Sequence, residues 1–306
     1  TYNFLNSNEL FLVKNKKKII RLIKNITFKM YEWQNYMNIT KNNLSLFGDA
    51  ANSNIIQTNH LFQYAANLGL RNNITEKKFK YLKESGFITF KNKNYKIILN
   101  VGNLKARYIP GHSHADSLSY ELSLNDRKII TNTGVSTYNH SAQRINERSA
   151  SYHNTIDIND RSFSEIWSSF RMGRSSLVKQ PKILKKNNKI TIETTQFDYK
   201  NYFNKIHHKR LCELENDKII ISDYLNKNIK SNSYIILNEN FKIEEIEDNK
   251  LKISVDNDNV FIIQIIKGSA RVEDFELPID FNKFINTKRI IIKLVYQHSK
   301  YSIEKL

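Results

Sequence analysis

The sequence FITFKNKNYKIILNV, residues 87–101, marks the point at which the spacing of apolar residues changes. Within it, Tyr95, Ile97, Leu99 and Val101 follow the two-residue period of a β-strand. Similar segments, separated by turns rich in Asn and Asp, continue toward the C-terminus. Further strands are expected at residues 117–123, 189–195, 218–222, 234–237, 250–255, 260–266 and 289–296. Many short strands without intervening helices predict antiparallel sheets stacked as a sandwich.

Before this stretch the apolar residues recur at steps of three and four, the period of an amphipathic helix. One helix is predicted through Ile19 and Met37, and a second from Thr58 to a stop at Gly69. A third is predicted from Thr75, with Phe79 and Leu82 inside it and a stop at Gly86. We therefore predict an α+β fold, with a helical segment in residues 1–90 and a large antiparallel β-sandwich in residues 91–306.

The composition favours an anionic partner. The 48 Lys and Arg residues outnumber the 30 Asp and Glu residues, which gives a formal charge of +18. A lysine-biased composition would produce the same excess without any function. The basic residues are scattered and form no recognisable nucleic-acid module, so nucleic acid is not the expected partner. No apolar run is long enough for a membrane span. The single cysteine, Cys212, excludes an intrachain disulfide and a zinc ribbon.

Three of the eight histidines stand in unusual settings. His112 and His114 lie two residues apart just before a predicted strand, in a pattern completed by Asp116, and His153 follows later. Between His114 and His153 in the sequence, the stretch 129–134 ends a predicted strand and contains Asn132, whose side-chain amide offers an oxygen. Imidazoles with an oxygen donor can form a divalent-metal site. The alternative is that they are hydrogen-bonded histidines at a sheet edge, and we interpret His140, His207 and His208 as structural.

A second cluster combines basic and aromatic residues. Guanidinium groups match the oxygens of carboxylate and sulfate, and tyrosine can stack on sugars and donate a hydrogen bond. The alternative is ordinary ion pairing within loops, for which Glu147 and Glu165 are the nearest partners. The cluster consists of Tyr138, Arg144, Arg148, Tyr152, Arg171 and Arg174.

The motif PGHSHADSLSYELS, residues 110–123, resembles the heparinase II/III-like family of polysaccharide lyases. The resemblance continues in IITNTGVSTY (129–138), RSASYHNTIDINDRSFSEIW (148–167) and FRMGR (170–174), in the order that the family shows. It implies an α/α toroid followed by an antiparallel β-sandwich, with residues 1–90 as the last helices of the toroid. The family's preceding helices carry an essential tyrosine and an Asn or His that neutralises the substrate carboxylate. These are not visible here, so a truncated chain is expected.

The resemblance also implies a reaction. Such lyases cleave a glycosidic bond beside a uronic acid by β-elimination, which requires neutralisation of the carboxylate, a base and an acid. His112 matches the histidine that holds the carboxylate or transfers protons. We expect His112 and Tyr152 to be catalytic, and Tyr138, Arg148 and Arg171 to bind acidic polysaccharide.

The resemblance further implies a metal site. His114 and His153 match ligands of a structural zinc found in some members, and the third ligand there is an aspartate at the position of Asn132. The neutral amide of Asn132 is a weaker donor, so zinc on His114, Asn132 and His153 is expected to bind with reduced affinity. Without metal, these three residues would form a hydrogen-bonded cluster that braces the cleft.

Two other functions compete with the lyase. The first is a non-catalytic carbohydrate-binding or assembly protein in the handling of surface polysaccharide, which the missing toroid and Asn132 favour. The second is nucleic-acid binding, which only the charge favours. The family's usual setting implies a location in the periplasm or cell envelope.

Overall fold

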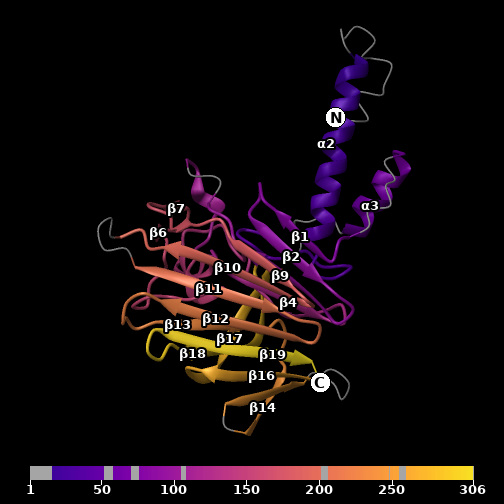
Figure 1. Ribbon diagram of the computed structural model, residues 1–306. Coiled ribbons are helices and arrows are strands. Elements are labelled where there is room, and N and C mark those ends of the chain that lie inside the picture. Colours follow the sequence, from indigo (N-terminus) through magenta and orange to yellow (C-terminus); the bar gives the residue numbers. More distant parts are fainter. Residues whose placement is uncertain are drawn as a thin grey trace.

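The computed structural model describes residues 16–51, 58–69, 76–104, 108–200, 206–247, 249–254 and 260–305. Two helices extend from one side of a body of sheets (Figure 1). They are α2 (Lys16–Met37) and α3 (Thr58–Asn67), and they confirm the first two predicted helices. Tyr36 and Met37 at the end of α2 are buried, and Met37 packs with Ile39 and Ile98 on the outer face of the first sheet. The helical segment therefore joins the sheets at its C-terminal end.

The first sheet has five antiparallel strands in sequence order. They are β1 (Phe79–Leu82), β2 (Phe87–Lys91), β3 (Tyr95–Asn100), β4 (Tyr120–Leu124) and β5 (Arg127–Ile130). All residues of β4 are buried because α2 and its loop cover one face while the other faces the core. A strand covered on both faces is apolar along its length, which explains the run of Ile97, Ile98 and Leu99 in β3.

The second sheet has nine antiparallel strands among the described residues. Exposure alternates along β10, β11 and β12, so one face meets the core and the other meets solvent. The strands are β8 (Leu177–Val178), β9 (Lys182–Lys186), β10 (Lys189–Phe197), β11 (His207–Leu214), β12 (Lys218–Leu225), β14 (Lys242–Glu247), β15 (Lys250–Ser254), β16 (Val260–Lys267) and β19 (His298–Lys305).

A three-stranded sheet and a short hairpin complete the strands. The sheet consists of β13 (Asn232–Ile236), β18 (Lys283–Lys293) and β17 (Ser269–Asp280), and the hairpin of β6 (Ile166–Ser168) and β7 (Arg171–Met172). One apolar core joins the five-, nine- and three-stranded sheets, with Ile97, Ile221 and Ile290 fully buried in it. At about 1.5–3 kcal/mol for each large apolar side chain, this core is the main source of stability. The predicted antiparallel sandwich is confirmed.

The helix expected from Thr75 to Gly86 is wrong where the structure describes it. Residues 79–82 form β1, which pairs with β2, and Phe79 and Tyr81 pack against the core. Phe79 and Leu82 fit a helical spacing, but burial against the sandwich overrides that local preference. Gly86 ends a tight turn with a positive φ, and Thr75 lies outside the described residues. The division into two domains near residue 90 stays a prediction, although the first sheet already begins at Phe79.

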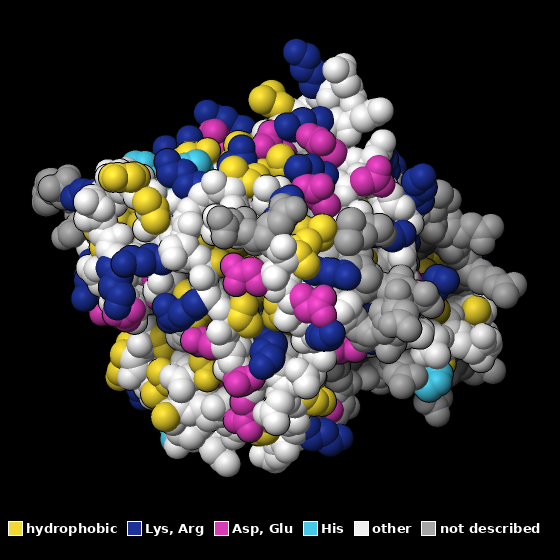
Figure 2. All heavy atoms as spheres, turned by 90° about the horizontal axis from the view of Figure 1, so that it is seen from below, with side chains coloured by type: hydrophobic (Ala, Val, Ile, Leu, Met, Phe, Trp, Pro, Cys, Tyr) yellow, Lys and Arg dark blue, Asp and Glu magenta, His cyan; other side chains and the backbone are white. Residues whose placement is uncertain are grey.

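The basic excess is mixed with acidic residues on the face seen from below (Figure 2). Several lysines there and elsewhere form ion pairs, among them the half-buried Lys218 with Glu304 and the exposed Lys242 with Glu244. Surface pairs of this kind contribute little to stability. In the part of the chain that the structure describes, no helix is both long and apolar enough to cross a membrane.

Candidate active site

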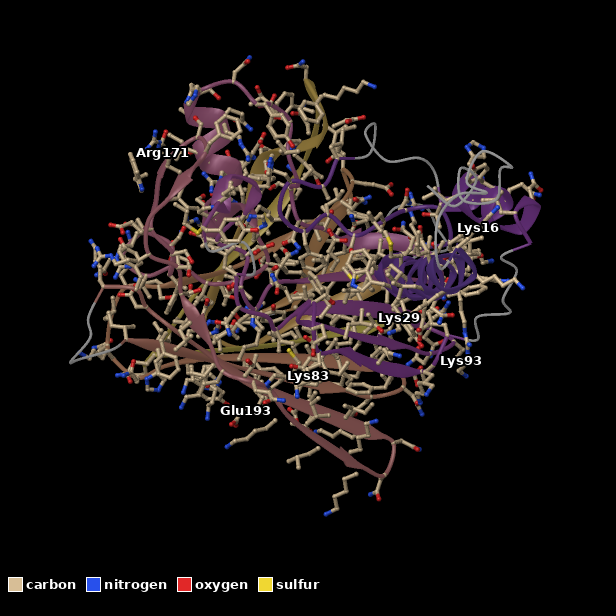
Figure 3. All side chains as sticks on the ribbon, turned by 90° about the horizontal axis from the view of Figure 1, so that it is seen from above. Lys16, Lys29, Lys83, Lys93, Arg171 and Glu193 are labelled. Atoms are coloured by element: carbon tan, nitrogen blue, oxygen red, sulfur yellow. The ribbon has the colours of Figure 1, made fainter. Side chains whose placement is uncertain are left out.

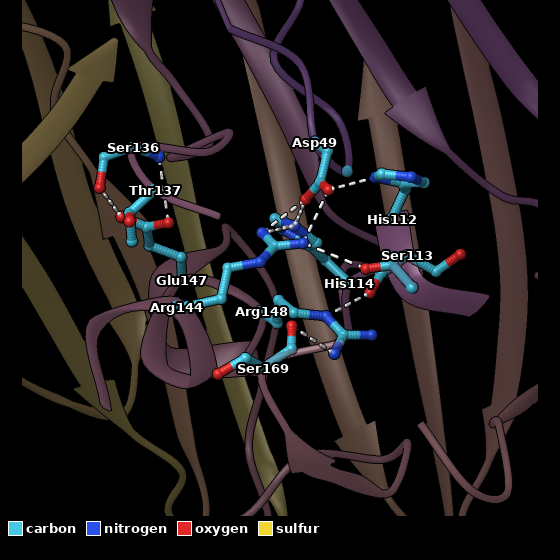
Figure 4. A network of polar contacts seen from close by, with 12 residues as sticks. Asp49, His112, Ser113, His114, Ser136, Thr137, Arg144, Glu147, Arg148 and Ser169 are labelled. Carbon is cyan, nitrogen blue, oxygen red and sulfur yellow. Dashed lines mark hydrogen bonds and ion pairs between the residues drawn. The ribbon is translucent and has the colours of Figure 1, made fainter. Parts of the chain in front are cut away.

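The centre of the site is Asp49, whose carboxylate collects three cationic or donor groups (Figure 4). Its Oδ1 lies 2.7 Å from Nε2 of His114, and its Oδ2 lies 2.7 Å from Nδ1 of His112. Arg144 binds both oxygens, at 2.6 Å and 2.7 Å, in the bidentate geometry that suits a guanidinium and a carboxylate. Asp49 therefore joins the two histidines of the 112–114 motif.

The loop that carries Asp49 is fixed to the first sheet and to the turn beside it. The amide of Leu46 donates to Glu121, and the amide of Gly48 donates to Asp116. The amide of Asp49 donates to the carbonyl of His112 at 3.3 Å. Gly48 has a φ of +57°, and a Cβ there would lie 3.0 Å from the same carbonyl. Only glycine fits this close approach without strain, so the loop and the His112 turn form one unit.

Arg144 reaches Asp49 from the short helix α4 (Ala142–Glu147). Ser141 begins this helix, and its side chain accepts the amide hydrogen of Arg144. Arg144 is fully buried, and NH2 also donates to the carbonyl of Gly111 at 3.1 Å. Burial alone would raise the pKa of Asp49, but hydrogen bonds and charges from His114 and Arg144 outweigh it and hold the pKa well below its usual range. Asp49 is therefore a permanent carboxylate at the site.

His112 is the exposed member of this network. It ends the 3₁₀ turn η2 (Pro110–His112), and 69% of its side chain is exposed, against 6% for Asp49. Because Nδ1–H donates to the carboxylate, Nε2 can accept or transfer a proton, and it has no hydrogen-bond partner among the described residues. The ring of Tyr138 lies 5.7 Å from that of His112. Burial and the nearby Asp49 raise the pKa of Tyr138, which keeps its phenol neutral.

Behind Asp49 lies a buried chain of His114, His153 and Asn132. Nδ1 of His114 is 3.2 Å from Nε2 of His153, and Nδ1 of His153 is 3.3 Å from Oδ1 of Asn132. Burial lowers the pKa of both histidines, so we treat them as neutral. In that state His114 donates Nε2–H to Asp49. Oδ1 of Asn132 also accepts the amide hydrogen of Asn154 at 3.2 Å, which fixes the orientation of the Asn132 side-chain amide.

These residues do not fit the expected zinc site in this arrangement. His114 and His153 direct nitrogens toward each other, but Asn132 contacts the opposite nitrogen of His153. The other nitrogen of His114 is taken by Asp49. Within the described ranges, no group of three or more His, Cys, Asp or Glu is placed to hold a metal ion. The contacts are those of a hydrogen-bonded cluster, and zinc stays a prediction through which we derive no step.

Arg148 has a different place from the one expected of a substrate-binding residue. It is fully buried, and its guanidinium donates to five backbone carbonyls: those of Pro110, Ser113, Ser168, Ser169 and Arg171. Since its donors are used within the protein, Arg148 holds the wall of the site and does not face a ligand. Arg171, by contrast, is exposed at the periphery of the molecule (Figure 3), as a substrate-binding residue must be.

Tyr152 is separated from this network by its contacts. It lies in the turn η3 (Ala150–Tyr152), with its ring 5.1 Å from that of Phe275 and near Arg289 of β18. Burial raises its pKa. No described contact joins Tyr152 to His112, so its catalytic role stays a prediction without geometric support. Tyr138 is the phenol that the structure brings to His112 and Asp49.

Asp49 is the central residue of this candidate site, and the sequence analysis did not single it out. It lies 63 residues before His112 in a loop without periodicity. The only available signal was the Gly48–Asp49 pair between apolar residues, a pattern that many ordinary turns share.

Comparison with known proteins gives two kinds of similarity. A family model described as Heparinase II/III-like, C-terminal, matches residues 74–304. A search of curated proteins found no match. Among solved structures, the heparan sulfate lyase HepC from Pedobacter heparinus is 17% identical with a TM-score of 0.74, and the similarity covers 94% of this chain and 47% of that one. A heparinase III is 16% identical with a TM-score of 0.72, covering 93% and 47%. The chain thus spans about half the length of these lyases, and at such identity the likeness concerns the fold.

Proposed function

The chain belongs to the heparinase II/III-like family, and on that premise we propose that it acts in a polysaccharide lyase that cleaves uronic-acid-containing polysaccharide by β-elimination. In this reaction a base removes the C5 proton beside the uronate carboxylate. The C4–O bond then breaks, a C4–C5 double bond forms, and the leaving oxygen takes up a proton. The heparan sulfate lyase with the same fold supports an anionic glycan as the substrate class.

The observation that carries this proposal is the exposed imidazole of His112 held by the buried carboxylate of Asp49. A carboxylate that accepts Nδ1–H fixes the tautomer and orientation of a histidine and stabilises the imidazolium that forms when Nε2 takes a proton. We therefore assign proton transfer to Nε2 of His112. The bidentate pair with Arg144 keeps Asp49 ionised and in place.

Other residues of the site have supporting roles in the proposal. Tyr138 is 43% exposed and presents its neutral phenol beside His112, where it can donate a hydrogen bond to a sugar oxygen. Arg171 carries exposed positive charge for the carboxylate or sulfate groups of the polymer. The groups that the family draws from helices before this segment would complete the site. A periplasmic or cell-envelope location accords with such a substrate and stays a prediction.

The test is a lyase assay with the complete protein and a panel of uronate-containing polysaccharides. Ultraviolet absorbance of the new double bond reports the reaction directly. We expect His112→Ala to lower the rate by about 10²- to 10⁴-fold, the usual contribution of a positioned acid or base. His60→Ala is the control, because His60 is exposed on α3 away from the network.

Two other outcomes would change the interpretation. An unchanged rate for His112→Ala would sink its assignment. Glycan binding without turnover across the panel would favour the carbohydrate-binding alternative. Repeating the assay with a chelator, together with metal analysis of the purified protein, tests the zinc prediction at His114, Asn132 and His153.

A further inference from the structure

The hairpin formed by β6 and β7 presents an aromatic and basic pair to solvent. Trp167 is 58% exposed, although tryptophan is usually well buried. The guanidinium of Arg171 lies over its ring, 5.4 Å from the ring centroid. Arg171 is exposed as well and points away from the sheets in Figure 3. The pair thus offers an apolar surface and a cation side by side.

The hairpin is attached to the turn that carries His112. Arg148 lies between them and donates to carbonyls on both sides: Ser168, Ser169 and Arg171 of the hairpin, and Pro110 and Ser113 around η2. Phe170 at the hairpin tip packs on Gly111, where an added Cβ would lie 3.4 Å from the Phe170 carbonyl oxygen. The position of the pair relative to His112 is therefore fixed.

An aromatic wall connects the two places. The ring of Tyr138 lies 5.7 Å from His112 and 5.8 Å from Phe170, and Arg144 lies against Tyr138 and Phe170. Phe170 stands between Trp167 and Arg171 in the sequence, at the turn of the same hairpin. The wall therefore leads from His112 to the hairpin that carries Trp167 and Arg171.

Neighbouring arginines differ in the use of their charge. Arg144 pairs with Asp49, and Arg174 pairs with Glu165 at 3.0 Å. Among the residues that the structure describes, no carboxylate pairs with Arg171. An exposed cation that is held on an aromatic ring and lacks an acidic partner is available to an anionic ligand.

We propose that Trp167 and Arg171 form a sugar-binding subsite, separate from the reaction centre, for an anionic residue of the polysaccharide. The apolar face of the pyranose stacks on the exposed indole, and the guanidinium binds the carboxylate or sulfate of the same sugar. This subsite rests on the proposed function, because it binds a further residue of the chain whose uronate lies at His112. It accounts for the exposed aromatic pair and for the fixed attachment of the hairpin.

The experiment uses the fluorescence of Trp167. Residues 1–306 contain two tryptophans, so Trp33→Phe leaves Trp167 as the single reporter in this chain, which is the protein used for the measurement. The probes are a heparin dodecasaccharide and an unsulfated oligoglucuronate of the same length, with a neutral dextran oligosaccharide as a control. We expect saturable quenching or a spectral shift with at least one anionic probe and none with dextran. These measurements are made with His112→Ala, so that cleavage of the probes is slowed.

Matched variants separate the subsite from general charge attraction. Arg171→Ala should raise the Kd for the anionic probe about tenfold, the effect of losing a charged hydrogen bond. Arg174→Ala should leave the Kd nearly unchanged, because the guanidinium of Arg174 already pairs with Glu165. Trp167→Ala should weaken binding measured by calorimetry. In the enzyme with His112 intact, Arg171→Ala should raise KM while kcat changes little.

Two results would overturn the subsite. One is the absence of any fluorescence change with both anionic probes, and the other is an equal loss of affinity in Arg171→Ala and Arg174→Ala. Lyase activity without any change in Trp167 fluorescence would reject the subsite and leave the proposed function. Specific quenching without lyase activity would reject the proposed function and leave the subsite.

Discussion

Two aspartates in this molecule are held in nearly the same way, yet they serve different purposes. Asp49 binds His114, His112 and Arg144, while Asp223 binds His208 at 2.7 Å and Arg210 at 2.7 Å and 2.9 Å. In both, histidine and arginine partners outweigh the effect of burial and hold the pKa of the carboxyl well below its usual range. Residue types alone do not distinguish a candidate site from a structural network.

The difference lies in where each network ends. The partners of Asp223 are buried in the sandwich. The hydroxyl of Ser233 donates to Oδ2 of Asp223, and Arg210 also donates to the carbonyls of Leu118 and Asn154. The Asp49 network ends in His112, most of which is exposed. An imidazole at the surface can meet a ligand, whereas a sealed one can only hold strands together. Exposure of the last member, rather than a perturbed pKa, identifies the site.

The largest expected effect follows from breaking the sealed network. Asp223→Ala leaves Arg210 and His208 buried without their acceptor, so we expect the free energy of unfolding to fall by about 3–5 kcal/mol. Denaturant unfolding measures this change. Asp160→Asn, which removes the charge of the exposed pair with Lys230 but still tolerates the positive φ at this position, should change stability little. Equal losses in the two variants would contradict the structural role of Asp223.

The second effect should appear mainly in the reaction. Asp49→Asn keeps the shape of the side chain but removes the charge that orients His112. We expect kcat to fall at least about tenfold, with a smaller change in KM and a stability loss of about 1–3 kcal/mol. Lyase kinetics and denaturant unfolding of the same preparation separate the two. A stability loss as large as that of Asp223→Ala, with an unchanged kcat, would mean that the Asp49 network is structural like the Asp223 network.

A third effect is a pH dependence of stability that the buried histidines of both networks share. Burial lowers the pKa of His114, His153 and His208 in the folded state, while the unfolded chain returns each to about 6.5. Below that pH the unfolded chain binds protons that the folded protein does not, so stability falls as pH falls. Each histidine contributes at most about 1.4 kcal/mol per pH unit, between its folded and its unfolded pKa.

Asp116 acts in the opposite direction in the same range. Burial raises its pKa to about 6, so the folded protein binds a proton there before the unfolded chain does. Asp116 therefore offsets part of the loss that the histidines cause. Unfolding measured between pH 7 and 5 should still show stability falling with pH, and His208→Gln should reduce that slope. A slope unaffected by this substitution would mean that His208 titrates normally.

Much of the fold could be predicted because periodicity survives in the final structure. The helical spacing in residues 19–37 and the alternation in residues 95–101 became α2 and β3. Residues 79–82 were predicted as helix because the apolar pair Phe79 and Leu82 has a helical spacing. Two apolar residues also fit a strand, and the packing of Phe79 against the sandwich core favours the strand. Local spacing carries no information about which surface will cover it.

The candidate site could be predicted only in part for a similar reason. The motifs placed His112, His114, Asn132 and His153 in one region, and the structure brings them into one chain of contacts through Asp49. Arg148 and Arg171 belong to the same basic and aromatic cluster in the sequence, yet Arg148 is buried and Arg171 is exposed. Whether a guanidinium faces carbonyls or solvent depends on how distant turns pack, which sequence spacing does not encode.

The carbonyl contacts of Arg148 also have a thermodynamic consequence for recognition. The hairpin with Trp167 and the turn with His112 are ordered when the protein folds, because one guanidinium holds both. A polymer that binds along this wall therefore does not have to immobilise those loops at the moment of association. The conformational entropy lost on binding falls mainly on the flexible glycan, so stiffening the glycan rather than the protein is the route to tighter binding.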